Sequence, residues 1–550
     1  MRTLDATRTD DARYLALKAR DARFDGSFFT GVTSTGIYCR PVCGVKTPRR
    51  ENCRFFSHAA QAESAGFRPC LRCRPELAPN SIAWSIQDAS YILAHQAARL
   101  LDEPETWESS APTRVASRTA LPLEGAHFTL GRPGGETPAS PSMEQLARRL
   151  GVSDRHVRRI FEAQFGVSPV QYLQTRRLLT AKQLLADTDL PITQVALISG
   201  FGSVRRFNAA FVAHYKLNPT QLRRAGAAPA GPGISVRLGY RPPYDIDAML
   251  AFFGKRQLGA IEFVATSQDH PRAGMTFCLE SGGRTHAGWL VAEFDGAHHQ
   301  VILRVSDSLR DVLPQVIRRA RAAFDLDADP LAINSVLNPR FPQGDGLRVP
   351  GTLDGYELAV RAVLGQQITV AAARTLGTRL VEKFGAPMQT PFPELTRLFP
   401  APAVLAQVGG DALGQLGIVR QRQAAIVAIA RAVAEKRLQL HGGADVGATI
   451  AALKELPGIG DWTAQYIAMR ALRWPDAFPA GDVALQKALG VLEPKNPLRA
   501  AREAEAASTA WKPWRSYAVI RAWATLPEPV KKPTTTKKIA ISPCNTRATA

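Results

Sequence analysis

Four cysteines near the N-terminus constrain this chain more than any other feature of its sequence. They form two close pairs, C-R-P-V-C at 39–43 and C-L-R-C at 70–73, with 26 residues between the pairs. A tetrahedral metal ion takes two ligands from each short pair, and the intervening loop brings the pairs together. On spacing alone, such a site is structural zinc. The expected ligands are Cys39, Cys43, Cys70 and Cys73.

Disulfide bonds are a weaker explanation for these cysteines. The N-terminus carries no apolar segment of the kind that directs secretion, so we expect a reducing cytoplasm. No stretch approaches the length of uninterrupted apolar residues that spans a membrane. Cys53 lies outside the metal spacing, and we expect a small buried side chain there.

Length and charge indicate a nucleic-acid protein with several domains. A chain of 550 residues exceeds one domain. Its formal net charge of +21 and isoelectric point near 10.0 favour a polyanionic partner. The 69 basic residues are widely spread, as a genome-wide bias toward arginine also produces, so charge supports this interpretation without deciding it. We expect a monomer that binds double-stranded DNA.

The residues around the four cysteines are more specific than the spacing. T-G-V-T-S-T-G-I-Y precedes Cys39, and A-G-F-R-P precedes Cys70. Roughly the first 80 residues resemble the zinc domain of the Ada family, bacterial methylphosphotriester repair proteins that regulate the adaptive response. The resemblance implies that Cys39 is both zinc ligand and methyl acceptor. It implies DNA contacts by Thr35, Lys46 and Arg68, whereas Gly44 replaces a basic residue of the family.

Zinc-bound thiolate chemistry fits a one-way switch. Zinc keeps a thiolate deprotonated, and the thiolate is the nucleophile. Four thiolates around Zn²⁺ carry a net charge of −2, and methylation of one leaves −1, so DNA phosphates repel the repaired cluster less. A domain in which zinc only stabilises a DNA clamp, with Cys39 a mere ligand, stays open as an alternative.

Composition divides the chain into four domains. We expect a zinc domain at 1–102 that ends in a helix over 81–101, a DNA-binding domain at 143–225, an α+β domain at 234–348 and a helical domain at 349–527. Segments rich in Pro, Ser, Thr, Gly or Ala predict linkers at 103–142 and 226–233. A basic low-complexity tail at 528–550 is typical of disorder.

The segment 143–225 predicts two helix-turn-helix units. In the first, Gly151 supplies the turn and Ser153 the N-cap of the second helix; in the second, Gly200 and Gly202 form the turn and Ser203 the cap. Two such units in tandem resemble the AraC-type DNA-binding domain, which implies major-groove contacts and RNA polymerase as a partner. A generic helical bundle is a weaker alternative. The residues expected to face DNA are Arg155, His156, Arg159, Arg205, Arg206 and Asn208.

The second half predicts a different fold. Alternating segments near Phe263, at 288–294 and at 300–305 indicate a small sheet, and the chain from Val349 onward is mostly helical. Nearly all of 234–526 resembles the helix-hairpin-helix DNA glycosylases, those of the AlkA 3-methyladenine type most closely. The expected fold is thus multidomain and mainly α, with a small α/β zinc domain, a double helix-turn-helix, a mixed α+β subdomain and an all-α glycosylase core.

The hairpin L-P-G-I-G ends at Gly460 and has a direct use in DNA binding. Gly458 and Gly460 allow the turn, and amides at the start of the next helix bind a phosphate. The resemblance adds a monovalent cation held by the hairpin carbonyls. Asp482 lies 22 residues beyond Gly460 and matches the catalytic aspartate of the family. An Asp before a helix is also typical of an N-cap, which is the alternative for Asp482.

Aromatic residues and one missing lysine refine the expected chemistry. The resemblance implies that Trp462, Tyr466 and Trp523 line a pocket that stacks on a flipped, positively charged base. Glycosylases that also cut the backbone carry a lysine where this chain has Trp462, so we expect hydrolytic base removal alone.

Together these features predict an alkylation-damage protein. We expect methylphosphotriester sensing at Cys39, activation of transcription, and excision of N-alkylated purines of the 3-methyladenine and 7-methylguanine class by Asp482. A transcriptional regulator whose glycosylase half only binds DNA is the alternative.

Overall fold

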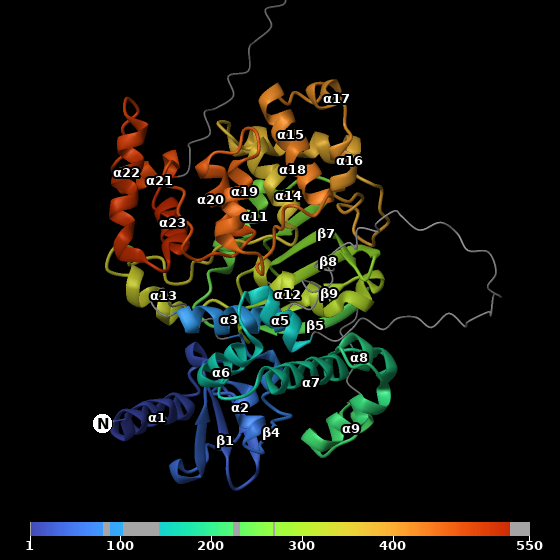
Figure 1. Cartoon of the computed structure of the whole chain (residues 1–550), viewed down its shortest axis with the longest axis vertical. Coiled ribbons are helices and arrows are strands. Elements are labelled where there is room, and N and C mark those ends of the chain that lie inside the picture. Colours follow the sequence, from blue (N-terminus) through green and yellow to red (C-terminus); the bar gives the residue numbers. More distant parts are fainter. Residues whose placement is uncertain (1, 81–88, 103–141, 224–231, 268–269, 528–550) are drawn as a thin grey trace, which may run out of the picture.

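The computed structural model describes residues 2–80, 89–102, 142–223, 232–267 and 270–527. Figure 1 shows an elongated molecule in which strand β1 and helix α9 lie at one end and helices α15–α17 at the other. The expected linkers at 103–142 and 226–233 and the tail at 528–550 fall wholly or largely outside the described residues. No helix among those described is long and apolar enough to cross a bilayer.

The N-terminal segment forms a four-stranded sheet in the order β3-β1-β2-β4. Its strands are β1 (Phe29–Val32), β2 (Ile37–Cys39), β3 (Cys53–Phe56) and β4 (Arg68–Pro69). Strands β2 and β4 are parallel and pair Tyr38 with Pro69, so Cys39 and Cys70 leave the sheet at the same edge. Helices α1 (Arg2–Ala19) and α2 (Ala59–Ser64) pack on this sheet, and α3 (Ala89–Asp102) follows; the expected residues 81–88 of that helix are not described.

Two helix-turn-helix units follow, as the sequence predicted. The helices are α5 (Met143–Leu150), α6 (Asp154–Phe165), α7 (Pro169–Asp187), α8 (Ile192–Ile198), α9 (Val204–Tyr215) and α10 (Pro219–Leu222). Gly151 ends α5 in the left-handed region with φ of 68°. The hydroxyl groups of Ser153 and Ser203 accept hydrogen bonds from the backbone N–H groups of His156 and Arg206, which caps α6 and α9.

A five-stranded antiparallel sheet in the order β5-β9-β8-β7-β6 begins the second half. Its strands are β5 (Ile234–Gly239), β6 (Glu262–Ala265), β7 (Arg272–Ser281), β8 (Arg284–Asp295) and β9 (Gln300–Val305). The sequence did not predict β7. Its interior Gly274 weakens the local strand pattern, but the ring of Phe263 occupies the space that a Cβ at this position would need. Helices α11 (Ile246–Arg256) and α12 (Leu313–Ala323) share a core with this sheet, whereas α13 (Pro330–Leu337) packs into the core of the helical last third.

The last third of the chain is helical and encloses one large hydrophobic core. Its helices are α14 (Gly355–Leu364), α15 (Val370–Phe384), α16 (Pro402–Ala406), α17 (Gly410–Gly414), α18 (Arg420–Ala434), α19 (Val446–Lys454), α20 (Asp461–Arg470), α21 (Val483–Leu489), α22 (Pro497–Ser508) and α23 (Arg515–Ala524). Trp514 and Tyr517 are buried in this core. The fold places the hairpin between α19 and α20.

The two halves of the chain pack against each other. One hydrophobic core joins α7, α8 and α9 to the five-stranded sheet. At the same boundary, the fully buried guanidinium of Arg241 donates hydrogen bonds to backbone carbonyls of the zinc segment and of the loop before α13. The accepting residues are Asp25, Pro79, Asn80, Asp327 and Ala328.

Candidate functional site

The four cysteines converge at the edge of the first sheet. Their sulfur atoms all lie within 4.8 Å of one another, and Cys39, Cys43 and Cys70 are buried. Ligand sulfurs about 2.3 Å from a tetrahedral zinc ion lie about 3.8 Å apart, which this cluster accommodates. Backbone N–H groups of Arg40 and Arg72 donate to the sulfurs of Cys73 and Cys70, at 3.3 and 3.4 Å. The donor set fits Zn²⁺.

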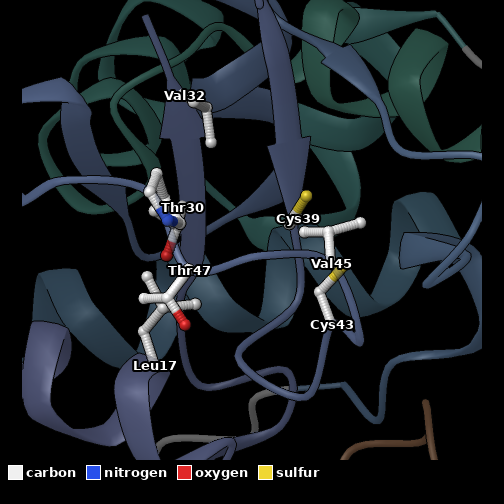
Figure 2. A pocket seen from close by; sticks show the side chains of 8 residues that line it. Leu17, Thr30, Val32, Cys39, Cys43, Val45 and Thr47 are labelled. Carbon is white, nitrogen blue, oxygen red and sulfur yellow. The ribbon is translucent and has the colours of Figure 1, made fainter.

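A small cavity lies beside Cys39 and Cys43. In Figure 2 the side chains of these cysteines and of Val45 lie across from those of Leu17, Thr30 and Thr47. The cavity measures about 20 Å³ and receives side chains from α1 and β1, including Leu17 and Thr30. Hydrogen bonding with Cys39 lowers the pKa of the Cys43 thiol to about 7. Cys53 stands apart as a buried thiol, as predicted, and burial raises its pKa.

The residues of the zinc segment that we expected at DNA are accessible. Thr35 is exposed in the turn between β1 and β2, and Arg68 is half-buried on β4, where its N–H donates to Gly36. Lys46 is exposed three residues beyond Cys43, close in sequence to exposed Gly44. These residues present two basic groups and a hydroxyl group at the surface of the zinc segment.

The predicted DNA-facing residues of the helix-turn-helix units lie on α6 and α9. The side chains of Arg155, Arg159, Arg205, Arg206 and Asn208 are exposed, and His156 is half-buried. Arg159 contacts the imidazole Nδ1 of His156 at 3.1 Å. The opposite faces of the two helices carry the buried phenylalanines.

A buried carboxyl joins the zinc segment to these helices. Glu63 on α2 accepts hydrogen bonds from the hydroxyl of Tyr38, at 2.9 Å, and from the hydroxyl of Thr175 on α7, at 2.8 Å. His214 on α9 lies 3.6 Å from the same carboxylate. Burial raises the pKa of Glu63 to about 7, although the two hydroxyl donors lower it.

The hairpin between α19 and α20 is fastened to the loop after α14. Gly458 has a φ of 75°, which glycine adopts without strain, and Gly460 is exposed at the N-cap of α20. The side-chain amide of Gln366 donates to the carbonyl of Gly458 at 2.9 Å and to the hydroxyl of Thr463 at 3.0 Å. Sequence reasoning missed Gln366, because only the fold brings α14 beside the hairpin.

Asp482 lies where three helices meet. Its Oδ1 accepts a hydrogen bond from the backbone N–H of Leu485 at 2.7 Å, so it caps α21. Its Oδ1 also accepts from the indole N–H of Trp523 on α23, and its Oδ2 from that of Trp462 on α20, both at 2.9 Å. The predicted aspartate and two of the predicted aromatics therefore form one cluster, in which Asp482 is also the N-cap that we weighed as the alternative.

Tyr466 packs against Trp462 in this cluster. Its ring stacks on that of Trp462, with centroids 5.4 Å apart and an interplanar angle of 11°. The hydroxyl accepts a 2.6 Å hydrogen bond from Arg470, which also donates to the carbonyls of Pro350 and Gly351. Burial raises the pKa of Tyr466, but Arg470 and Arg256 outweigh burial and hold it below its ordinary value. Neither arginine was predicted from the sequence.

Four family models match separate parts of the chain. They are the metal binding domain of Ada over residues 12–76, a helix-turn-helix domain over 146–225, the AlkA N-terminal domain over 235–354, and the HhH-GPD superfamily of base excision DNA repair proteins over 360–515.

Curated relatives combine or separate these parts. A probable bifunctional transcriptional activator/DNA repair enzyme AlkA of Mycobacterium tuberculosis is 35% identical over 540 residues, 96% of this chain and 98% of the relative. DNA-3-methyladenine glycosylase 2 of Escherichia coli is 32% identical over 52% of this chain and 96% of its own. The bifunctional transcriptional activator/DNA repair enzyme Ada of the same organism is 32% identical over 35% of this chain and 43% of its own.

Proposed function

The chain belongs to the family of bifunctional transcriptional activator/DNA repair enzymes, and we propose that it senses methylphosphotriesters at Cys39 and excises N-alkylated purines through Asp482. The observation that supports this proposal most strongly is the placement of Asp482 between Trp462 and Trp523, in a chain that also brings four thiols together. We place methyl sensing in 1–102, promoter binding in 143–225 and excision in 234–527. Activation of transcription further requires contact with RNA polymerase, and we propose that the protein acts as a monomer.

Methyl transfer needs one nucleophile and no proton. The thiolate of Cys39 attacks the methyl carbon, an S–C bond forms, the C–O bond breaks, and the electron pair leaves with the phosphate oxygen, which regains its negative charge. Zinc, when bound by the four cysteines, would keep the thiolates deprotonated. Thr35, Lys46 and Arg68 would hold the flanking phosphates, because two are basic and all three are at least partly exposed in the segment that carries the cluster.

Base excision proceeds by loss of an already cationic base. The glycosidic C–N bond breaks, its electron pair neutralises the alkylated base, and an oxocarbenium-like sugar forms. The carboxylate of Asp482 stabilises that positive charge and orients the water that adds to the sugar and releases a proton. Because Trp462 stands at the position of the Schiff-base lysine, the product is an abasic site in an intact strand.

The hairpin would hold the DNA strand beside the excised base. N–H groups at the start of α20, after Gly458 and Gly460, suit a phosphate. We also propose a monovalent cation at the hairpin carbonyls. The Gly458 carbonyl already accepts from Gln366, so this cation would share that oxygen with the amide.

Release of methylpurines from alkylated duplex DNA tests the enzyme. The intact protein should release them, and Asp482→Asn should lose almost all activity while it retains the oxygen that caps α21. Asp445→Asn is the matched control, because Asp445 caps α19 in the same way and lies outside the proposed site. If wild type binds DNA but releases no base, the glycosylase half is only a DNA-binding module.

Mass spectrometry of the protein after incubation with methylphosphotriester DNA tests the sensor. We expect one added methyl group on Cys39, which Cys39→Ser abolishes and Cys53→Ser retains. Zinc bound without any methyl adduct would make the segment a zinc-stabilised DNA clamp instead.

A further inference from the structure

The carboxylate of Asp482 is held by donors from three helices. The indole N–H groups of Trp462 and Trp523 come from α20 and α23, and the third donor is the N–H of Leu485 in α21. Rotation of the carboxylate about its bond to Cβ would break all three hydrogen bonds. Asp482 and both tryptophans are only half-buried, so the cluster lies at the surface of the core, where DNA can reach it.

We propose that Trp462 and Trp523 are positioning residues for Asp482, whose N–H groups fix the carboxylate so that Oδ2 faces the reacting sugar. This inference rests on the proposed glycosylase function. It assigns the two indoles a role through their N–H groups that is separate from stacking on the base.

Of the two carboxylate oxygens of Asp482, Oδ2 is the one that can still accept a hydrogen bond. Each carboxylate oxygen accepts about two hydrogen bonds. Oδ1 already accepts from Trp523 and Leu485, whereas Oδ2 accepts from Trp462 alone. The remaining acceptor capacity therefore lies on Oδ2, which is the oxygen available to the sugar or to the attacking water.

The support behind Trp462 extends into the core. One face of its ring is covered by Tyr466, whose hydroxyl is held by Arg470. Arg470 is buried and anchored to two backbone carbonyls. The ring of Trp462 is thus held with its N–H toward Asp482.

Replacement of one indole by a ring without the N–H tests the proposal. Trp523→Phe and Trp462→Phe keep an aromatic face and remove one donor each. We expect kcat for 7-methylguanine release to fall roughly 10- to 100-fold in each variant, with KM changed less than about threefold, since a hydrogen bond to a charged group is lost. Trp514→Phe, a core replacement without a contact to Asp482, controls for lost packing.

Two results separate failure of this proposal from failure of the enzyme assignment. If wild type releases base but the variants raise KM with an unchanged kcat, the indoles only stack on the base and the positioning role is wrong. If wild type itself releases no base while binding DNA, the proposed glycosylase function is wrong and the positioning role falls with it.

Discussion

Asp482 shows at the scale of one residue that a capping role and a catalytic role are compatible. Its Oδ1 caps the N-terminus of α21, and its Oδ2, which accepts one hydrogen bond, can accept another. The sequence presented these roles as alternatives because each of them predicts an aspartate before a helix.

The cap makes a separable prediction about stability. Asp482→Ala removes the acceptor for the N–H of Leu485 and should lower the free energy of unfolding by about 1 kcal/mol relative to Asp482→Asn, which keeps an oxygen there. Urea denaturation of the two variants measures this difference. Equal stability would mean that the side-chain amide of the Asp482→Asn variant no longer accepts that hydrogen bond.

At the scale of elements, the contact of α2 with α7 and α9 depends on the carboxyl of Glu63. Tyr38, Thr175 and His214 surround it, and Lys182 is the nearby cation. The folded-state pKa of about 7 exceeds the ordinary value of 4.5, so folding favours the protonated form. That contribution is complete below about pH 4.5 and is lost as pH rises through 7, an effect of about 3 kcal/mol.

Glu63→Gln should remove this dependence. We expect the variant to gain about 3 kcal/mol of stability relative to wild type between about pH 4.5 and pH 8, because glutamine remains neutral in both states. Urea denaturation across this pH range measures it. Glu162→Gln, at an exposed glutamate of α6, should show no such trend.

At the scale of the whole molecule, Arg241 joins the two halves. Its buried guanidinium donates hydrogen bonds to five backbone carbonyls, which come from both sides of the boundary. Arg241→Met leaves those carbonyls without their donor and should destabilise the protein by about 3 kcal/mol or more. We expect urea unfolding to separate into two transitions, one for each half. Arg340→Met, at an exposed position, should unfold as wild type does.

The thiol cluster is connected to the same boundary. Arg40 donates through its backbone N–H to the sulfur of Cys73 and through its side chain to the carboxylate of Asp25, whose carbonyl accepts from Arg241. Removal of zinc by a chelator should therefore lower the thermal midpoint and increase amide exchange in residues 237–241 as well as around the cysteines. Restored zinc should reverse both changes, and Arg241→Met should abolish the change at 237–241. Exchange confined to the cysteines in wild type would contradict this connection.

Local chemistry explains what the sequence alone determined. The cysteine spacing, the hairpin glycines and the serine caps of α6 and α9 each act over a few residues, so their patterns are visible in the chain itself. The resemblance to known families then supplied Asp482 and the aromatic residues. Strand β7 was not predicted from the sequence, because its interior glycine is explained only by a ring that comes from another strand.

Tertiary structure decided the contacts between distant residues. The indole of Trp523 reaches Asp482 across 41 positions, Gln366 reaches Gly458 across 92, and Arg241 reaches Asp25 across 216. No spacing in the chain encodes such pairs, because they depend on how helices and sheets pack against a common core. The sequence thus determined which chemical groups are present and how each element begins and ends, and packing decided which of those groups meet.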